Sequence, residues 1–346
     1  MEFKYVPVLK NRQSEREALE NQTIGDKIIP LVEMVIEKPN VNSKGTFATV
    51  QEPFLKKIGR PVIVDIPMYL NLTPKTINSV SQFLAPIYAS QLLRINYLNQ
   101  LATLKNIKII PTVSYMPNVP YLPGFITQQA NVLRQNFPNI AYRVYSDVTP
   151  IAISEIRSTF SDNDIIILDI DENPHTQSSL VNTYRDINNL KSLKSCKTVL
   201  VRSAIPQSLK NTSILDGHVI GVADNSLMNY HTTYGFDSFG DCAGIRRAEI
   251  ENIPASSPAY INYYQPNNVF VGYKGIYNTL RTFTSHVLPN YTASIHWTTL
   301  TGNHKDSCYG CKLINSMLYS GQSANSAPKW KAITIAHYIK SIDELL

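Results

Sequence analysis

The sequence lacks the segments that place a protein in or across a membrane. No window approaches 18 consecutive uncharged apolar residues, so no transmembrane helix is expected. The first residues, MEFKYVPVLKNRQSEREALE, contain no apolar core of signal-peptide length. Only 4 of 346 residues are Cys, which is too few for a disulfide framework in a chain of this length. We therefore expect a soluble protein in a reducing cytoplasm, with no membrane partner.

Several catalytic motifs are also missing. There is no P-loop, no G-x-S-x-G elbow and no H-E-x-x-H, which argues against Walker-type ATP hydrolysis, α/β-hydrolase chemistry and zincin chemistry. Charged residues make up only 17% of the chain, and the net charge of +6 is spread without a block of five or six consecutive basic residues. Such a mild basic excess fits a phosphate-containing small molecule or nucleic acid, although an ordinary solvated surface explains it as well.

Short β-rich apolar runs alternate with longer helical stretches over the first 250 residues. DIIILDID (164–171) is the clearest buried strand, and TPIAISEIRSTF (149–160) reads as a helix. Apolar runs without strict alternation are typical of parallel strands covered on both faces. Seven or eight such units predict a (β/α)8 TIM-type barrel over residues 1–250. A doubly wound open sheet is the alternative, but no strand is followed by G-x-G-x-x-G.

Other strands are expected in the following segments: 4–10, 28–35, 60–69, 106–115, 139–146, 196–205 and, more weakly, 218–226 and 236–245. A helix is expected to begin at Thr73, where TPKT resembles an N-cap followed by Pro. From residue 251 to 346 we expect a C-terminal appendage that packs on the barrel. It contains a β-hairpin (259–275) and a final helix after Pro328.

Charged residues lie within or directly after most of the predicted strands. Because barrel enzymes keep their chemistry at the carboxyl ends of the strands, we expect these side chains to converge on one ligand site. The acids would act as catalytic groups or hold a divalent metal, and the remaining residues would bind a phosphate-containing ligand. The predicted catalytic residues are Glu33, Asp65, Asp169 and Asp171, the last two on one strand face; the predicted ligand-binding residues are Lys10, Arg143, Arg202, Asp237 and Asp241.

The alternative interpretation of these charges is structural. Charged groups in apolar strands are costly unless they are paired, and Asp169 with Arg202 on adjacent strands would make such a pair.

A second cluster, near the C-terminus, combines His and Cys. His296, His304, Cys308 and Cys311 are a chemically legitimate zinc set, and the two Cys could also serve redox chemistry. The spacing matches no common zinc pattern, so we expect the Cys residues to pack as small core residues and the protein to hold little zinc.

Two further segments suggest binding surfaces. Residues 231–247 combine aromatics and Gly with Arg246 and Arg247, which could hold phosphate late in the barrel or close it as a tight aromatic turn. The Tyr-rich segment 257–278 could be the contact face of a non-catalytic protein-interaction scaffold. The same aromatics beside Lys274 and Arg281 could instead bind nucleic acid.

The two ends of the chain resemble a known family. YVPVLKNRQSEREALE followed by IIPLVEMV, and CYGC followed by a helix, a Trp and a late His, are similar to the phage beta-protein family. The resemblance implies a TIM-type barrel from phages or bacterial mobile and defence loci, hence a role in phage–host conflict, without an assigned reaction. The positions that match the pattern are Tyr5, Lys10, Glu17, Glu33, Cys308, Cys311, Trp330 and His337.

Overall fold

The computed structural model describes residues 2–39, 42–224, 226–248, 250–251 and 258–346. Residues 225 and 257, which fall in a predicted strand and in the Tyr-rich segment, lie outside this part of the chain. By its internal contacts the chain divides into two compact units, and each is discontinuous in sequence. The first comprises Met1–Arg12, Ile28–Arg202 and Leu227–Asp241, and the second Gln13–Lys27, Ser203–Ser226 and Cys242–Leu346. This division differs from a single boundary at residue 250.

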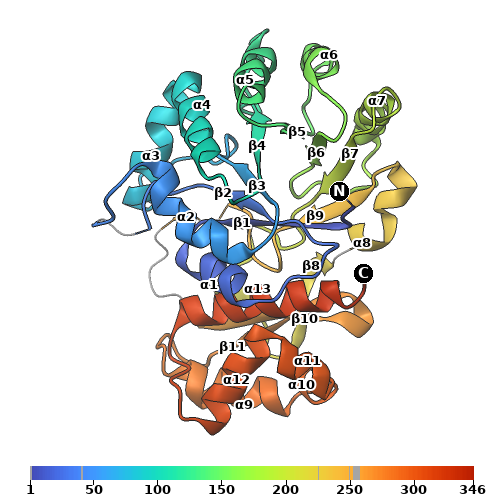
Figure 1. Cartoon of the computed structure of the whole chain (residues 1–346). Helices are drawn as coiled ribbons and strands as arrows, with labels where there is room; N and C mark the ends of the chain where they lie inside the picture. The colour runs from blue at the N-terminus through green and yellow to red at the C-terminus, as the bar shows by residue number, and fades with distance from the viewer. Residues whose placement is uncertain (1, 40–41, 225, 249, 252–257) are drawn as a thin grey trace. The chain divides into compact units, whose positions relative to one another are not determined.

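The first unit is a closed barrel of eight parallel strands, as the sequence predicts (Figure 1). Its interior is filled by branched aliphatic side chains such as Ile63, Ile167 and Val199, because apolar residues point inward from each strand. The strands, in spatial order, are β1 (Tyr5–Lys10), β2 (Leu31–Glu33), β3 (Val62–Asp65), β4 (Ile109–Ser114), β5 (Ala141–Tyr145), β6 (Ile165–Asp169), β7 (Lys197–Val201) and β9 (Ser238–Asp241).

Helices connect these strands and lie around the outside of the barrel (Figure 1). The helix predicted over residues 149–160 is confirmed as α6, which Thr149 caps: its side chain accepts a hydrogen bond from the Ala152 backbone N–H, and Pro150 opens the helix. The helices of this unit are α2 (Phe47–Ile58), α3 (Asn78–Ala89), α4 (Gln91–Gln100), η1 (Leu101–Thr103), α5 (Phe125–Arg134), α6 (Pro150–Thr159), η2 (Ser178–Leu180), α7 (Val181–Lys191), α8 (Leu227–Tyr230) and η4 (His231–Tyr234).

Two predictions about the barrel are wrong in detail. The helix expected at Thr73 begins only at Asn78, because Thr73 and Thr76 form a turn in which the Thr73 backbone N–H donates to the Thr76 hydroxyl. The weak strand at 218–226 is β8 (His218–Asp224), which does not belong to the barrel. It pairs antiparallel with β11 (Val269–Lys274) of the second unit, and β9 closes the barrel instead.

The second unit is built on the three-stranded sheet β10–β11–β8. The predicted hairpin is confirmed as β10 (Ala259–Tyr264) and β11 (Val269–Lys274), joined by η5 (Gln265–Asn267). The final helix α13 (Ala327–Asp343) packs on β10, on α12 (Tyr309–Tyr319) and on α1 (Gln13–Asn21), which explains why α1 belongs to this unit. The remaining helices are η3 (Asn211–Ser213), η6 (Phe283–Val287), α9 (Leu288–Ala293), α10 (Ile295–Thr298), α11 (Gly302–Ser307) and α12 (Tyr309–Tyr319).

None of the helices in the described part of the chain combines the length and hydrophobicity needed to cross a bilayer.

Candidate functional site

Five of the eight barrel strands end on a charged residue. These residues are Lys10, Glu33, Asp65, Asp169 and Asp241, at the ends of β1, β2, β3, β6 and β9. In the strand register Lys10 lies beside Glu33, and Glu33 lies beside Asp65. All five side chains are buried. The parallel strands therefore bring charges that are distant in sequence to the carboxyl-terminal edge of the barrel, as predicted.

Arg143, in β5, connects three of these carboxylates. Its Nη1 donates to Glu33 Oε1 at 2.7 Å and to Asp65 Oδ2 at 2.8 Å. Its Nη2 and Nε donate to Asp169 Oδ2 at 2.6 and 3.2 Å. The guanidinium also lies over the ring of Tyr69, 5.0 Å from its centroid. The structural ion pair of Asp169 is therefore made with Arg143, and not with Arg202 as the alternative interpretation supposed.

Two more cations complete the network. Lys10 Nζ lies 3.2 Å from Glu33 Oε2, and the Tyr69 hydroxyl donates to the same oxygen at 3.0 Å. Arg94, in α4, donates through Nη2 to Asp65 Oδ1 at 2.7 Å. Lys10, Arg94 and Arg143 thus face Glu33, Asp65 and Asp169, three positive charges against three negative ones. We call these six residues the strand-end network.

Arg94 is the member of this network that the sequence analysis missed. It is fully buried, and it shares the inward face of α4 with Ile95 and Leu98. An Arg four residues before a buried Leu is the signal that could have indicated it, since positions i and i+4 share a helix face. Arg94 also donates to the Gln129 side chain and to the carbonyl oxygen of Ile66.

The network changes the acidity of its own members. Burial alone would raise the pKa of the Asp65 carboxyl, but Arg143, Arg94 and a hydrogen bond from Thr112 hold that pKa below its usual value. Burial would lower the pKa of Arg143, yet the surrounding carboxylates raise it well above its usual range. Asp65 is therefore an ionised hydrogen-bond acceptor at neutral pH and a poor general acid.

Asp241 and Arg202, two of the predicted ligand-binding residues, lie at the same edge of the barrel and contact residues that are not members of the strand-end network. The Tyr5 hydroxyl donates to Asp241 Oδ1 at 2.7 Å. Arg202 directly follows β7, and its Nε donates to the carbonyl oxygen of Asn173 at 3.0 Å.

Asp171 and Asp237 are not brought into the strand-end network. Asp171 lies beyond the end of β6 with a φ of 55°, is exposed, and its backbone N–H donates to Asp169 Oδ1; the two acids therefore do not share a strand face. Asp237 precedes β9 at the amino-terminal edge of the barrel, where it pairs with Lys191 at 2.7 Å and accepts from Thr198.

The acids of the network are not arranged like metal ligands. Glu33, Asp65 and Asp169 already face Arg or Lys, so a divalent cation would have to displace a positive side chain. Such a displacement is unfavourable because the divalent cation and the buried Arg or Lys beside it carry like charges and would repel each other. The structure favours hydrogen-bonding chemistry at these acids over the metal centre considered from the sequence.

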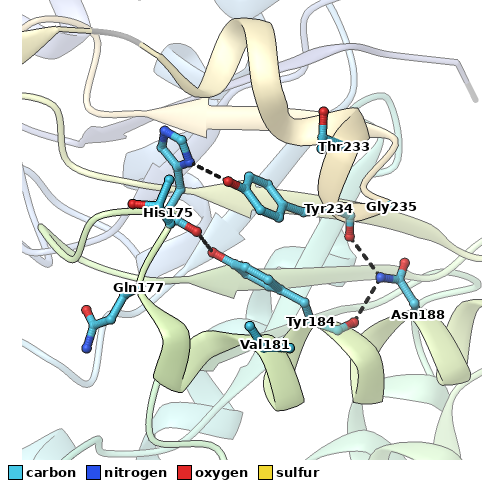
Figure 2. Close-up of a pocket in the computed structure, with 9 residues that line it drawn as sticks. His175, Gln177, Val181, Tyr184, Asn188, Thr233, Tyr234 and Gly235 are labelled. Carbon is cyan, nitrogen blue, oxygen red and sulfur yellow. Dashed lines mark hydrogen bonds between the residues drawn. The ribbon is translucent and has the colours of Figure 1, made fainter.

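A separate pocket of about 500 Å³ lies on the first unit, between the loop after β6, α7 and η4 (Figure 2). The Tyr234 hydroxyl lies 2.9 Å from His175 Nδ1, and the Tyr184 hydroxyl donates to the His175 carbonyl oxygen at 2.9 Å. Asn188 bridges the carbonyl oxygens of Tyr184 and Tyr234. The volume suits a small molecule. The segment 231–247 contributes Thr233, Tyr234 and Gly235 to this pocket, whereas none of the predicted site residues lines it.

The second unit groups three of the four residues of the predicted zinc set with a different His. His304, Cys308, Cys311 and His337 place their ligand atoms within 4.8 Å of one another, and all four are buried. His296 lies elsewhere, with Nδ1 2.5 Å from the Tyr273 hydroxyl and its ring against Tyr264.

The other predicted surfaces look different in the structure. Tyr260, Tyr263 and Tyr273 of the Tyr-rich segment are buried, so these three stabilise the second unit and cannot form a contact face, whereas Tyr277 is exposed. Lys274 Nζ donates to the carbonyl oxygen of Thr212, and Arg246 Nη1 donates to that of Leu209. These contacts support neither the protein-interaction scaffold nor the nucleic-acid-binding interpretation.

The positions that carry the family resemblance fall into two groups. Lys10 and Glu33 lie at the carboxyl-terminal ends of β1 and β2, and Tyr5, the first residue of β1, donates its hydroxyl hydrogen to Asp241. In the second unit, Glu17 accepts from the Tyr309 hydroxyl at 2.9 Å, the indole of Trp330 donates to the Ala324 carbonyl oxygen, and Cys308, Cys311 and His337 form the cluster described above.

The closed parallel barrel and its buried charges define a TIM-type α/β-barrel protein. The family model described as "Beta protein" matches residues 5–342. The chain therefore belongs to the Beta protein family, which confirms the resemblance. No curated protein matches the chain.

Among solved structures, the tryptophan synthase α-subunit of the hyperthermophile Pyrococcus furiosus is similar at 11% identity. That match covers 70% of this chain and 88% of that one with a TM-score of 0.40. The tryptophan synthase complex of the same organism is similar at 11% identity over 70% and 88% of the two chains, with a TM-score of 0.39. At this level of similarity neither structure informs the activity.

Proposed function

We propose that the chain binds or processes a phosphate-containing or nucleotide-like ligand at the carboxyl ends of its barrel strands, as part of a conflict between phage and host. The observation that carries the proposal is the strand-end network itself. Buried ion pairs rarely stabilise a fold more than apolar side chains of similar volume would. A barrel that nevertheless concentrates six charges at the edge where barrel proteins bind ligands is best explained by a ligand.

The chemistry of the network suits such a ligand. A nucleotide offers hydroxyl and amino hydrogens to carboxylates such as Glu33 and Asp169, and phosphate oxygens to Lys10 and Arg143. Lys10 is the most suitable phosphate contact because it contributes a single flexible charge at the end of β1. The carboxylates would position hydroxyl groups or accept protons from the bound ligand.

The cleanest test removes Lys10, because every carboxylate of the network then keeps a cationic partner. Glu33 retains Arg143 and Tyr69. Isothermal titration calorimetry of the full chain with inorganic phosphate, AMP and ATP should find one probe that binds. The Lys10→Met substitution should lower the affinity for that probe by about tenfold or more, since a hydrogen bond to a charged group contributes about 1.5–3 kcal/mol.

The matched control is Lys191→Met, which removes a carboxylate-paired lysine at the amino-terminal edge of the barrel. It should leave the affinity unchanged. If Lys10→Met binds the tightest probe as well as the unmodified chain does, the proposal fails.

The role in conflict rests on the family resemblance, and the free cysteines of the described chain fit the cytoplasm, where nucleotides are abundant. Cells that express the unmodified chain should differ from cells that express Lys10→Met in plaque formation by an infecting phage. Equal plaque counts for the two at equal protein levels would contradict this role.

A further inference from the structure

The strongest unassigned feature lies in the second unit, at the junction of α11, α12 and α13. His304 is in α11, Cys308 caps α12, Cys311 is in its first turn, and His337 is in α13. Their four ligand atoms lie within 4.8 Å of one another, and the four residues are buried. Within the part of the chain that the structure describes, they form the one group of three or more such residues arranged in this way.

Groups outside the four-residue cluster orient the imidazoles of His304 and His337. His304 Nδ1 lies 2.8 Å from Glu344 Oε2, and His337 Nε2 lies 3.1 Å from the carbonyl oxygen of Tyr263. A carbonyl oxygen and a carboxylate can only accept, so each of these outer nitrogens carries the hydrogen. In a neutral imidazole the other nitrogen then presents a lone pair. Such contacts from a carboxylate and a backbone carbonyl are the usual way in which proteins orient metal-binding His.

The inner nitrogens face each other. His304 Nε2 and His337 Nδ1 are 3.1 Å apart. Two neutral imidazoles with their lone pairs directed at one another cannot form a hydrogen bond, and the contact calls for a cation between them. Cys308 and Cys311 lie beside the same point, with Cys311 Sγ 3.7 Å from His337 Nδ1.

The distances fit one tetrahedral ion. Zinc bonds of about 2.0–2.1 Å to nitrogen and 2.3 Å to sulfur place two nitrogens about 3.3 Å apart and a nitrogen and a sulfur about 3.6 Å apart. The structure has 3.1 and 3.7 Å for these two separations. Two thiolates with two imidazoles are a donor set that favours zinc among the common divalent metals.

The backbone is also shaped for this junction. A Cβ on Gly310, between the two cysteines, would lie 2.7 Å from the carbonyl oxygen of Ile333 and 3.4 Å from the backbone nitrogen of His337. Glycine therefore lets α12 approach α13 closely enough for Cys311 to meet His337. The Cys311 backbone N–H lies 3.4 Å from Cys308 Sγ and donates to it, which further stabilises a thiolate at this sulfur.

We infer that His304, Cys308, Cys311 and His337 bind one zinc ion. Four protein ligands leave no open position, so the ion is structural and fixes α11, α12 and α13 to one another. A pocket of about 320 Å³ that reaches His304, His337 and Glu344 gives the ion a route to the site. This inference reverses the expectation of little zinc from the sequence, where His296 stood in the place of His337.

The test is elemental analysis of the full chain, purified without chelator from cells grown with added zinc. We expect about one zinc per chain, as a closed four-ligand site requires. Replacing zinc by Co²⁺ should give the visible absorption of tetrahedral cobalt with thiolate ligands. Removing the metal with a chelator should lower the melting temperature, and returning zinc should restore it, because metal binding is coupled to folding.

Variants separate this site from the rest of the chain. Cys311→Ser and His337→Gln should each reduce the zinc content severalfold or more. Cys242→Ser and His296→Gln, which change another buried Cys and the excluded His of the same unit, should retain it. If Cys311→Ser does not fold, the cobalt spectrum of the unmodified chain still shows whether thiolates bind a tetrahedral metal ion. The inference is overturned by less than about a tenth of a zinc per chain under reducing conditions without a cobalt spectrum, or by full zinc in the His337→Gln variant.

Discussion

Arg143→Met is the perturbation whose consequence follows most directly from the strand-end network. Met keeps much of the volume but removes the charge, so the network would hold the carboxylates Glu33, Asp65 and Asp169 against only Lys10 and Arg94. Breaking a buried ion pair typically costs about 3–5 kcal/mol. The unpaired carboxylate can instead bind a proton, so the free energy of protonation sets an upper limit of similar size on the loss of stability. Neutralising one carboxyl of ordinary pKa near 3.9 costs about 4 kcal/mol at pH 7 and about 1.5 kcal/mol at pH 5.

The loss of stability in Arg143→Met should therefore become smaller as the pH falls. The excess carboxyl in the variant has a raised pKa in the folded state, so protonation stabilises the variant increasingly as the pH falls. We expect the difference in free energy of unfolding between the unmodified chain and Arg143→Met to fall by about 2–3 kcal/mol from pH 7 to pH 5.

Urea unfolding at both pH values measures this difference, provided that the slopes with denaturant agree. Adding Asp169→Asn to Arg143→Met should recover part of the loss at pH 7, since it restores the charge balance. Lys191→Met, at a partly exposed pair, should cost only about 0–1 kcal/mol. A loss below about 1 kcal/mol for Arg143→Met at pH 7 would show that the carboxylates do not depend on Arg143 for their stability in the fold.

Two further predictions concern single residues. Asp65 has a lowered pKa in the folded state, so it stabilises the fold above its unfolded pKa of about 3.9, and this contribution is lost as the pH falls through the lower, folded value. Acid unfolding of Asp65→Asn should therefore be less steep than that of the unmodified chain, and identical slopes would contradict this. Gly310→Ala should cost about 1–3 kcal/mol and weaken zinc binding, because its Cβ meets the backbone of Ile333. Unchanged thermal stability and zinc content would show that α12 and α13 can separate without loss.

The barrel was predictable because its strands carry a strong local signal. Runs such as residues 165–168 of β6 are apolar on both faces, and this pattern does not depend on distant residues. The convergence of Lys10, Glu33, Asp65, Arg143 and Asp169 also followed from one geometric rule, that parallel strands align their carboxyl ends. The position of Asp171 did not follow, because the rule fails where the strand ends and φ turns positive.

The features that were missed depend on contacts between distant segments. Arg94 reaches Asp65 from a helix, and His337 reaches Cys311 across 26 residues, so neither spacing forms a recognisable motif. β8 was misplaced because a short apolar strand carries no mark of the sheet to which it belongs. The tyrosines of β10 and β11 were taken for a surface because Tyr suits a half-buried interface and a core equally well.

The proposal that the strand-end network binds the ligand can be tested by a crystal structure of the full chain with the tightest phosphate-containing probe. It predicts phosphate oxygens within hydrogen-bond distance of Lys10 Nζ, with Glu33 or Asp169 accepting from the rest of the molecule. A probe bound instead in the pocket between His175, Tyr184 and Tyr234 (Figure 2), with the contacts of Arg143 and Lys10 unchanged, would contradict it.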